Sequence, residues 1–286
     1  MKPHTMMSHR ERVLRLLVTI ESNLSADLSL ETLARQAGFS PYHLHRIFRA
    51  LVGEPVKEYV RRLRLERAAH ELAFGARPII QIALDAGYET HESFTRAFRA
   101  ALGTPPSEYR ETRKRSPVSS SPPKGDPAES RHARVEQLRP LRVAFIRHVG
   151  PYEAVIPVFN HLSEWVRERQ HEPTDVMWIG VPHDNPAVTP PNKLRFDCCV
   201  MVTGDIAAAG EIGVREIGGG AYATTTHYGA FDGLVETYGW LGGHFMPSAG
   251  LIPRQAPAIE IYLTNPETTA PEQLLTDILL PVEGGR

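Results

Sequence analysis

The sequence predicts a multidomain protein, in which an all-α N-terminal domain with a double helix-turn-helix precedes an α+β C-terminal domain. Three observations lead to this prediction. A helical pattern in the first third of the chain repeats after 50 residues, and a stretch rich in proline and serine follows it. The remaining sequence has short β-branched runs, aromatic residues and many Gly and Pro turns. A chain of 286 residues is also long enough for about two domains.

The predicted boundaries follow the composition. Residues 8–113 form the helical domain, residues 114–132 form a Pro/Ser-rich linker that cannot bury a core, and residues 133–284 form the second domain. Charge divides in the same way, because residues 1–115 carry a net charge of +6 and residues 116–286 a net charge of −7. A basic half indicates contact with nucleic-acid phosphate, although many globular domains carry such charges by chance.

One helix-turn-helix unit is used twice in the N-terminal domain. Ser29 is placed to cap the first helix of the first unit, and Gly38 can end that helix in the left-handed conformation. Ser40 is then placed to cap the second helix. The second unit repeats this order, with Gly87 ending its first helix and Thr90 capping its second.

The second helix of each unit has an apolar side and a basic side. In the first unit Leu44, Ile47 and Phe48 recur at helical spacing and are predicted to face inward. The opposite side holds four polar or basic residues, which are Tyr42, His45, Arg46 and Arg49. Such a surface suits the major groove of DNA, where arginine binds guanine through two hydrogen bonds. A solvated helical bundle is the alternative, but the same basic face at the same register in both copies favours DNA.

A single long helix is predicted between the two units. Residues 57–74 contain Arg61, Arg62, Arg64 and Arg67 together with leucines available for packing. A helix of this length measures about 27 Å at 1.5 Å per residue. That length makes it possible for a monomer to place two recognition helices in successive major grooves, which lie about 34 Å apart.

These features resemble the DNA-binding domain of AraC/XylS regulators over residues 8–113. The resemblance is carried by Ile82-Ala83, Gly87-Tyr88, Ser93-Phe94, Phe98-Arg99, Gly103, Pro105 and Tyr109-Arg110. It implies a seven-helix domain that binds an asymmetric DNA site. Its base-reading positions fall on Tyr42, His45 and Arg46 in the first unit and on His91, Glu92, Thr95 and Arg96 in the second, and Arg49 and Arg99 complete the predicted DNA surface. Glu92 departs from the neutral amide of many members, so it either accepts a hydrogen bond from cytosine or weakens the contact.

The C-terminal domain contains a second internal repeat, at a shift of 79 residues. Strands are predicted at 143–149, 177–181, 194–202, 221–227 and 258–263, and helices at 152–169 and 231–241. The run from His148 to Tyr152 matches the run from His227 to Phe231. Two such half-domains, packed side by side, are expected to leave a cleft between them.

Glu260 lies in the most informative of these strands. Alternation places Ile259, Ile261 and Leu263 on one face and Glu260 with Tyr262 on the other. A carboxylate among apolar neighbours is exposed, paired or reserved for a ligand, and residue type alone favours the first two.

The second half of the chain resembles the GyrI-like small-molecule-binding domain over about residues 133–284. The resemblance is carried by runs at 189–197, 227–234, 259–266 and 274–278. It implies two βαββ halves around a central cleft, in which a buried glutamate and aromatic walls bind lipophilic, often cationic compounds. The glutamate falls on Glu260, and the aromatic candidates are Tyr152, Trp178, Phe231 and Tyr262. The run His244–Pro247 departs from the Trp-Leu-Pro of relatives.

The function expected from both resemblances is a cytoplasmic, sequence-specific transcriptional regulator without enzymatic activity. Its partners are double-stranded DNA, a small lipophilic or cationic effector and, as a further candidate, RNA polymerase. Two alternatives remain: hydrolysis of a reactive small molecule with Glu260 as general base, and a C-terminal domain that serves only for protein contacts.

Other chemistry is not predicted. The chain has no apolar run that would span a membrane, no secretory signal and no motif for a cofactor. Its histidines are scattered, so no metal site is expected, and His148 and His227 are better explained by hydrogen bonds within the repeated turn. Cys198 and Cys199 are interpreted as small core residues rather than as a redox sensor.

Overall fold

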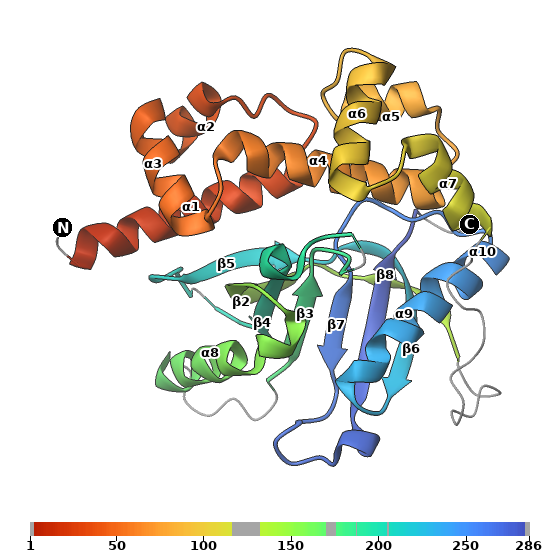
Figure 1. Ribbon diagram of the computed structural model, residues 1–286. Helices are drawn as coiled ribbons and strands as arrows, with labels where there is room; N and C mark the ends of the chain where they lie inside the picture. Colours follow the sequence, from red (N-terminus) through yellow and green to blue (C-terminus); the bar gives the residue numbers. More distant parts are fainter. Residues whose placement is uncertain (1–2, 116–131, 170–175, 187, 205, 284–286) are drawn as a thin grey trace. The chain divides into compact units, whose positions relative to one another are not determined.

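The computed structural model describes residues 3–115, 132–169, 176–186, 188–204 and 206–283 (Figure 1). Two compact units are present, one of which contains the N-terminal helices and the other most of the C-terminal part of the chain. The linker predicted for 114–132 falls mainly on residues 116–131, which lie outside the described residues.

The N-terminal part of the chain, residues 3–115, is all helical, which confirms the predicted fold class. Its helices are α1 (Pro3–Ser22), α2 (Leu30–Ala37), α3 (Pro41–Val52), α4 (Val56–Phe74), α5 (Ile79–Asp85), α6 (His91–Leu102) and α7 (Pro106–Arg115). Helices α2 and α3 form the first helix-turn-helix, and α5 and α6 form the second. Helix α4 contacts both α3 and the helices α5, α6 and α7, so it connects the two units through its packing.

The predicted caps are present in both units. The hydroxyl of Ser40 accepts a hydrogen bond from the amide of His43 at 3.3 Å, and the hydroxyl of Thr90 accepts one from the amide of Ser93 at 3.1 Å. The hydroxyl of Ser29 accepts one from the amide of Thr32 at 3.3 Å. These bonds satisfy amides at the first turn of each helix, which have no partner within the helix itself.

The glycine stops are also repeated. Gly38 has φ 67° and Gly87 has φ 84°, a region that glycine adopts without the steric penalty of a side chain. At each stop the following residue donates its amide to a carbonyl of the preceding helix, from Phe39 to Ala34 at 2.9 Å and from Tyr88 to Ala83 at 3.0 Å. The turn therefore has the same hydrogen-bond pattern in both copies.

The arginines of α4 stabilise the helical unit itself. Arg64 donates to the carbonyls of Leu24 and Ala26 at 2.9 and 3.0 Å, and Arg67 donates to the carbonyl of Asp85 at 2.8 Å. Arg62 binds Glu54 and Glu66 at 2.7 and 3.0 Å, and Arg61 pairs with Glu58. The high arginine content of this helix therefore has a structural explanation as well as an electrostatic one.

The C-terminal unit combines one antiparallel sheet with helices, as predicted. Its strands are β1 (Arg134–Leu138), β2 (Leu141–Val149), β3 (Trp178–Pro182), β4 (Arg195–Met201), β5 (Ile212–Ile217), β6 (Gly220–Tyr228), β7 (Ile259–Tyr262) and β8 (Leu275–Pro281). Its helices are α8 (Ile156–Arg169), α9 (Leu234–Trp240) and α10 (Met246–Ser248), with a π-helix η4 at Leu241–Phe245. Short 3-10 helices are η1 (Tyr152–Ala154), η2 (Pro191–Lys193), η3 (Phe231–Gly233) and η5 (Pro271–Gln273).

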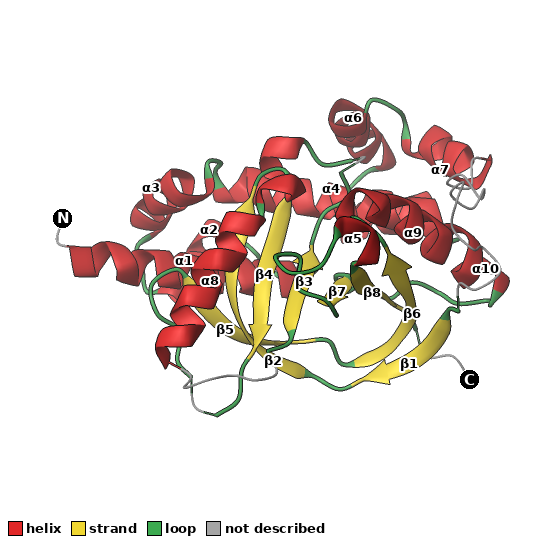
Figure 2. Ribbon diagram, turned by 90° about the horizontal axis from the view of Figure 1, so that it is seen from below, coloured by secondary structure: helices red, strands yellow, loops and turns green. Residues whose placement is uncertain are grey.

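The strand order is β1-β6-β8-β7-β3-β4-β2-β5, which is symmetric about the β7–β3 pair (Figure 2). Each half is a βαββ unit, formed by β2, α8, β3 and β4 or by β6, α9, β7 and β8. Strand β1 leads into the first half but pairs with β6 of the second, and β5 leads into the second half but lies beside β2 of the first. Strands β1 and β5 were not predicted from the sequence, because these short edge strands carry charged residues and lack clear alternation.

The hydrogen bonds at the turns confirm the C-terminal repeat. Nε2 of His148 lies 3.0 Å from the carbonyl oxygen of Pro151, and Nε2 of His227 lies 2.9 Å from that of Ala230. The interpretation of both histidines as turn residues is therefore confirmed. The equivalence shifts to 80 residues after the helices, because the amides of Gly150 and Gly229 donate to the carbonyls of Leu194 and Leu274 at 2.8 and 2.9 Å.

The two faces of the sheet have different roles. Helix α8 packs on β2 and β4. Residues of α9 and η4 pack with Ala223 and Ile278 in the core of the second half. This face is called here the helix-covered face (Figure 1). Cys198 and Cys199 are both fully buried with free thiols, and Cys198 lies on the helix-covered face, so both are core residues.

Two further observations concern only the described part of the chain. No helix there is both long and apolar enough to cross a membrane. The same residues contain no group of three or more His, Cys, Asp or Glu side chains arranged to hold a metal ion.

Candidate functional site

Helix α3 presents the first predicted reading surface. Leu44 and Phe48 are fully buried, so the opposite side of the helix faces solvent. Tyr42 is 73% exposed, and Arg46 is exposed as well. The guanidinium carbon of Arg46 lies 5.8 Å from the centre of the Tyr42 ring, a cation–π contact on the exposed side of the helix. His45 is half-buried, and Arg49 is exposed in the last turn.

Helix α6 presents the second surface with the same burial pattern. Phe94 and Phe98 are fully buried, at positions equivalent to Leu44 and Phe48. The exposed predicted residues are His91, Glu92, Arg96 and Arg99. Thr95 is half-buried, and its Oγ1 is buried without a hydrogen-bond partner among the described residues. The methyl group and the hydroxyl of Thr95 would have to exchange places before this hydroxyl touched a base.

One position gives the two surfaces a different charge. Tyr42 in α3 is replaced by Glu92 in α6, while the arginine four residues later is kept as Arg46 and Arg96. A carboxylate on the exposed face repels phosphate and accepts hydrogen bonds, whereas tyrosine offers a ring and a hydroxyl. The second surface is therefore less favourable for an anionic partner than the first.

Glu260 is the centre of the second candidate site, on strand β7 of the C-terminal unit. Its side chain is on the helix-covered face, and the residue is only 5% exposed. The hydroxyl of Tyr238 donates to Oε1 at 2.9 Å, and the hydroxyl of Tyr262 donates to Oε2 at 2.7 Å. The carboxylate is therefore buried and accepts hydrogen bonds from two tyrosines, which excludes the exposed position among the possibilities left open by the sequence.

Burial determines the protonation behaviour of this cluster. Burial raises the pKa of Glu260, and the two tyrosine hydroxyls oppose part of that shift by donating to the carboxylate. The pKa values of Tyr238 and Tyr262 are also raised, by burial and by the neighbouring carboxylate. Both tyrosines therefore stay protonated donors, and Glu260 takes up a proton more readily than an exposed glutamate.

Aromatic rings surround the carboxylate in one connected cluster. The ring of Tyr262 lies 5.6 Å from Phe159 and 5.6 Å from Phe231, measured between centroids. Phe159 also contacts Trp178 at 6.1 Å and Phe196 at 6.4 Å. Tyr152 joins the cluster through Phe196 at 5.3 Å. All four predicted aromatic candidates therefore belong to the same cluster as Glu260.

Gly180 makes the arrangement of Glu260 and Tyr262 possible. It pairs with Glu260 across the β3–β7 ladder, at the centre of the sheet. A Cβ at this position would lie 2.5 Å from the Tyr262 hydroxyl, 2.6 Å from Cζ of Phe196 and 3.0 Å from Oε2 of Glu260. Only glycine leaves room for the tyrosine hydroxyl to reach the carboxylate.

Four residues of this site were not predicted from the sequence. Phe159 and Phe196 connect the aromatic cluster, Tyr238 donates to Glu260, and Gly180 makes room. The equivalence of Phe159 and Tyr238 in the repeat was visible in the sequence and was a signal for both. No pattern in the sequence indicated Gly180, because its role depends on the pairing of β3 with β7.

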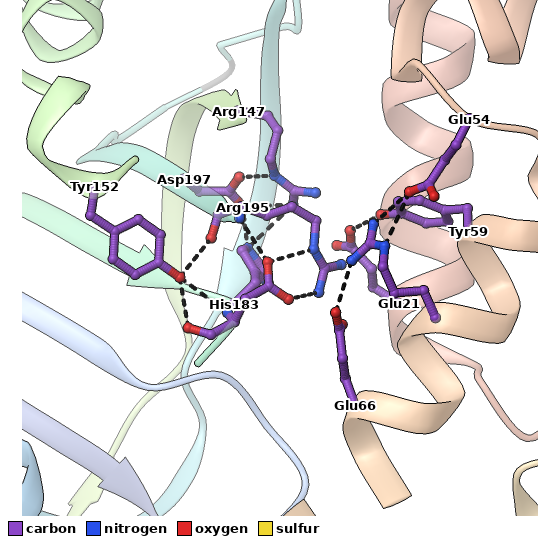
Figure 3. A network of polar contacts seen from close by, with 11 residues as sticks. Glu21, Glu54, Tyr59, Glu66, Arg147, Tyr152, His183, Arg195 and Asp197 are labelled. Carbon is purple, nitrogen blue, oxygen red and sulfur yellow. Dashed lines mark hydrogen bonds and ion pairs between the residues drawn. The ribbon is translucent and has the colours of Figure 1, made fainter. Parts of the chain in front are cut away.

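A buried ionic cluster occupies the opposite face of the sheet in the first half (Figure 3). Asp197 on β4 is fully buried and pairs with Arg147, Arg215 and His183, whose Nε2 lies 3.0 Å from Oδ2. Burial alone would raise the pKa of Asp197, but the two arginines and the histidine outweigh it and hold that pKa well below its usual value.

A second group of hydrogen bonds is joined to that cluster, because the amide of His183 donates to the carbonyl of Arg195 at 3.0 Å. Asp184 accepts from the amide and Nε of Arg195 at 2.7 and 2.9 Å. The hydroxyl of Tyr152 donates to the carbonyl of Asp184 at 2.7 Å. Tyr152 therefore holds the loop after β3, while its ring contacts Phe196. In the helical unit, Figure 3 shows Tyr59 donating to Glu21 at 2.7 Å.

Comparison with known proteins gives family matches for two separate parts of the chain. Residues 133–283 match the family model described as the GyrI-like small molecule binding domain, and residues 33–112 match that of a helix-turn-helix domain. The HTH-type transcriptional activator AarP of Providencia stuartii is 44% identical over 95 residues, which are 33% of this chain and 70% of AarP.

A curated relative and a solved structure are similar to this chain over most of its length. The transcriptional regulator Rob of Salmonella typhimurium is 26% identical over 290 residues, covering 93% of this chain and 96% of Rob. The cryo-EM structure of an EcmrR–DNA complex has a TM-score of 0.49 and 14% sequence identity, covering 89% of this chain and 98% of that chain.

Proposed function

The chain belongs to the GyrI-like family, carries an AraC-type helix-turn-helix domain and is a DNA-binding transcriptional regulator, and from this premise we propose that it responds to a small cationic, lipophilic effector. In this proposal residues 8–113 bind the operator, residues 133–284 bind the effector, and residues 114–132 connect these two domains. The observation that carries the effector part is the buried Glu260 carboxylate inside an aromatic cluster.

For the DNA domain we propose unequal roles for α3 and α6. Tyr42, His45 and Arg46 read bases, with Arg49 supporting them. The second surface, formed by His91, Glu92, Thr95, Arg96 and Arg99, contributes less base discrimination because of the exposed carboxylate of Glu92 and the buried hydroxyl of Thr95. Arginine bound to guanine through two hydrogen bonds gives about 1–3 kcal/mol of discrimination against the wrong base.

The effector site is supported by its chemistry. A cation attracts the faces of aromatic rings and is attracted in turn by a buried carboxylate, whereas a neutral apolar molecule leaves that carboxylate unused. Glu260 therefore selects for positive charge, and the aromatic rings of Tyr152, Trp178, Phe231 and Tyr262 select for apolar surface.

Selection of bound duplexes from a random pool tests the DNA assignment. We expect Arg46→Ala to lower affinity for a selected duplex by about tenfold or more, and to change affinity for random duplex much less. Arg96→Ala is the matched variant in α6 and is expected to have the smaller selective effect. Equal losses on both duplexes would mean that Arg46 contacts phosphate only, and an affinity independent of salt would contradict binding through phosphates.

Calorimetric titration with an aromatic ammonium compound tests the effector assignment. Glu260→Gln keeps the size of the side chain and removes its charge, so we expect affinity for the cation to fall. Affinity for a neutral aromatic compound of the same shape is the control and is expected to stay within about twofold. RNA polymerase remains a candidate partner of the same regulator, to be tested by adding it to the protein–DNA complex with and without effector.

A second candidate function is hydrolysis of a reactive small molecule, favoured by the hydrogen bonds of Tyr238 and Tyr262 to Glu260. Glu260 would act as general base and a tyrosine as proton donor. Both carboxylate oxygens already accept tyrosine hydroxyls, so a base role requires one of these bonds to break. Stoichiometric binding without turnover of a reactive electrophile favours the regulator without enzymatic activity, and product formation that depends on Glu260 favours the hydrolase.

A further inference from the structure

Helices α8 and α9 each bring one aromatic side chain to the centre of the helix-covered face. Phe159 on α8 and Tyr238 on α9 are equivalent in the repeat, at a shift of 79 residues. The central sheet positions, Gly180 and Glu260, are also equivalent, at a shift of 80 residues, and pair across the β3–β7 ladder. The centre therefore has a floor of Gly180 and Glu260 and a roof of Phe159 and Tyr238, which are called here the roof pair.

The roof pair is more exposed than the groups it covers. Phe159 and Tyr238 are half-buried, whereas Glu260 is 5% exposed and Phe196 is 3% exposed. Solvent therefore reaches the roof pair more readily than the carboxylate below it.

Phe159 occupies the aromatic part of the site. Its ring centroid lies 5.6 Å from that of Tyr262, 6.1 Å from that of Trp178 and 6.4 Å from that of Phe196, with interplanar angles of 84°, 81° and 73°. Edge-to-face pairs of this kind are favourable because the positive edge of one ring meets the negative face of another. Phe159 therefore makes with Tyr262 and Trp178 the contacts that an effector ring would make.

Tyr238 occupies the polar part of the site in the same way. Its hydroxyl donates to Oε1 of Glu260 at 2.9 Å, while Oε2 accepts from Tyr262 at 2.7 Å. The bond from Tyr262 is made within strand β7, whereas Tyr238 reaches the carboxylate from a separate helix. An N–H group of a cationic effector is able to replace the Tyr238 hydroxyl as the donor to Oε1, because it forms a stronger, charge-assisted hydrogen bond.

The helix that carries Tyr238 is less regular than its counterpart. Helix α8 is an α-helix of 14 residues, whereas α9 has seven residues and continues into the π-helix Leu241–Phe245. Segments of π-helix are rare and are found frequently at functional sites. We therefore expect the roof to move mainly on the side of α9.

We infer that the roof pair holds the place of the effector: the Phe159 ring stands in for the effector's aromatic body, and the Tyr238 hydroxyl stands in for the N–H donor of its cationic head. This inference rests on the proposed effector function and adds two specificity-determining residues to it. The ligand class that carries both replaced groups is an arylalkyl ammonium compound, and it has to displace both side chains.

This displacement lowers the observed affinity for the effector. A site that is accessible in only a fraction of the molecules binds with an affinity reduced by that fraction. Substitution of a stand-in should therefore strengthen binding, whereas substitution of a residue that forms the wall of the site should weaken it. The direction of the change separates the two roles.

Calorimetric titration of the full chain with benzylammonium and its neutral isostere ethylbenzene tests the inference. We expect Phe159→Ala to bind both probes about tenfold more tightly than wild type, because the ring of the probe replaces the ring that was removed. We expect Tyr238→Phe to bind benzylammonium about fivefold more tightly, because it loses only a competing donor. Its affinity for ethylbenzene should stay within about twofold of wild type.

Further variants serve as controls. Phe159→Leu keeps more apolar volume and should show a smaller gain in the same direction. Trp165→Phe removes buried surface from the same helix, and Tyr222→Phe removes a hydroxyl from the opposite face of the sheet, so both should bind the probes as wild type does. In a Glu260→Gln background the gain from Tyr238→Phe should disappear, since the competition for Oε1 is then absent.

Each variant decides on its own residue. An unchanged or weaker affinity for benzylammonium in Phe159→Ala or Tyr238→Phe would show that this side chain is not a stand-in, and an equal gain in Trp165→Phe would assign the effect to a loosened helix. In these cases the inference is wrong while the effector proposal stands, provided that Glu260→Gln weakens benzylammonium binding. If Glu260→Gln leaves that binding unchanged, or if neither wild type nor any variant binds a probe, both proposals fall.

Discussion

The two internal repeats of this chain have diverged in opposite places. In the helical unit the buried positions of α3 and α6, their N-terminal caps and the glycine stops agree between copies, and a difference in charge lies on the solvent face, where Tyr42 corresponds to Glu92. In the C-terminal unit the turn hydrogen bonds agree, and the difference lies on a buried face, where Gly180 corresponds to Glu260. Each repeat keeps the bonds that define its fold and varies the surface that would meet its ligand.

The divergence of the C-terminal halves extends to the other face of the sheet, and the largest predicted effect lies there. Asp197 and Asp277 are equivalent, but Asp197 pairs with two arginines and a histidine, whereas Asp277 accepts from Thr226 at 2.5 Å. We expect Asp197→Asn to lower the free energy of unfolding by about 3–5 kcal/mol, because it leaves two buried guanidinium groups without this carboxylate. Asp277→Asn should cost about 1 kcal/mol.

Urea unfolding followed by tryptophan fluorescence measures this difference in the intact chain. All three tryptophans, Trp165, Trp178 and Trp240, belong to the C-terminal unit, so the signal reports on that unit alone. Similar losses for the two variants would contradict the idea that the halves are stabilised differently on this face.

The second prediction concerns the centre of the sheet, where the halves meet. Gly180→Ala places a Cβ against Tyr262, Phe196 and Glu260, so we expect a loss of about 2 kcal/mol in unfolding free energy together with weaker effector binding. Gly204→Ala is not a suitable control because Gly204 has φ 74°, whereas Gly242→Ala meets only the end of the Leu280 side chain at 3.3 Å. Gly242→Ala should leave effector binding unchanged, and normal binding by Gly180→Ala would show that the Tyr262–Glu260 contact is dispensable.

The third prediction uses pH to separate Glu260 from its surroundings. The folded-state pKa of Glu260 is raised above its ordinary value of 4.5. Its favourable contribution to the free energy of unfolding is therefore complete below pH 4.5 and is lost as the pH rises through the folded-state pKa. Binding of a cation favours the ionised carboxylate, so affinity should rise over the same interval. In Glu260→Gln both pH dependences should disappear, as measured by unfolding and calorimetry at a series of pH values. If unfolding or affinity still depends on pH in Glu260→Gln, the titrating group is a residue other than Glu260.

The repeats also explain what the sequence was able to predict. Local signals such as Ser40, Thr90, Gly38 and Gly87 predicted the helical units well, because caps and stops act between residues close in the chain. Glu260 and its aromatic neighbours were found as candidates through their alternation and a family resemblance.

Long-range pairing set the limit of prediction in the C-terminal unit. The contact of Gly180 with Glu260, and the Asp197 cluster with Arg147, depend on which strands become neighbours. The strands β1 and β5 were missed for the same reason, since each is stabilised by pairing with the other half rather than by its own pattern. An alternation pattern shows which face a residue occupies but not what it meets there.

The smallest predicted effect tests whether the two helix-turn-helix units are energetically alike. The Ser40 and Thr90 caps have nearly the same geometry, at 3.3 and 3.1 Å, so Ser40→Ala and Thr90→Ala should each cost about 1 kcal/mol. Amide hydrogen exchange in the first turns of α3 and α6 measures each unit separately. Ser40→Asp and Thr90→Asp restore an acceptor at the positive end of the helix and should recover most of the loss. A loss restricted to one unit would mean that the copies differ in stability as well as in their exposed faces, and the unequal roles proposed for α3 and α6 would then have a second physical origin.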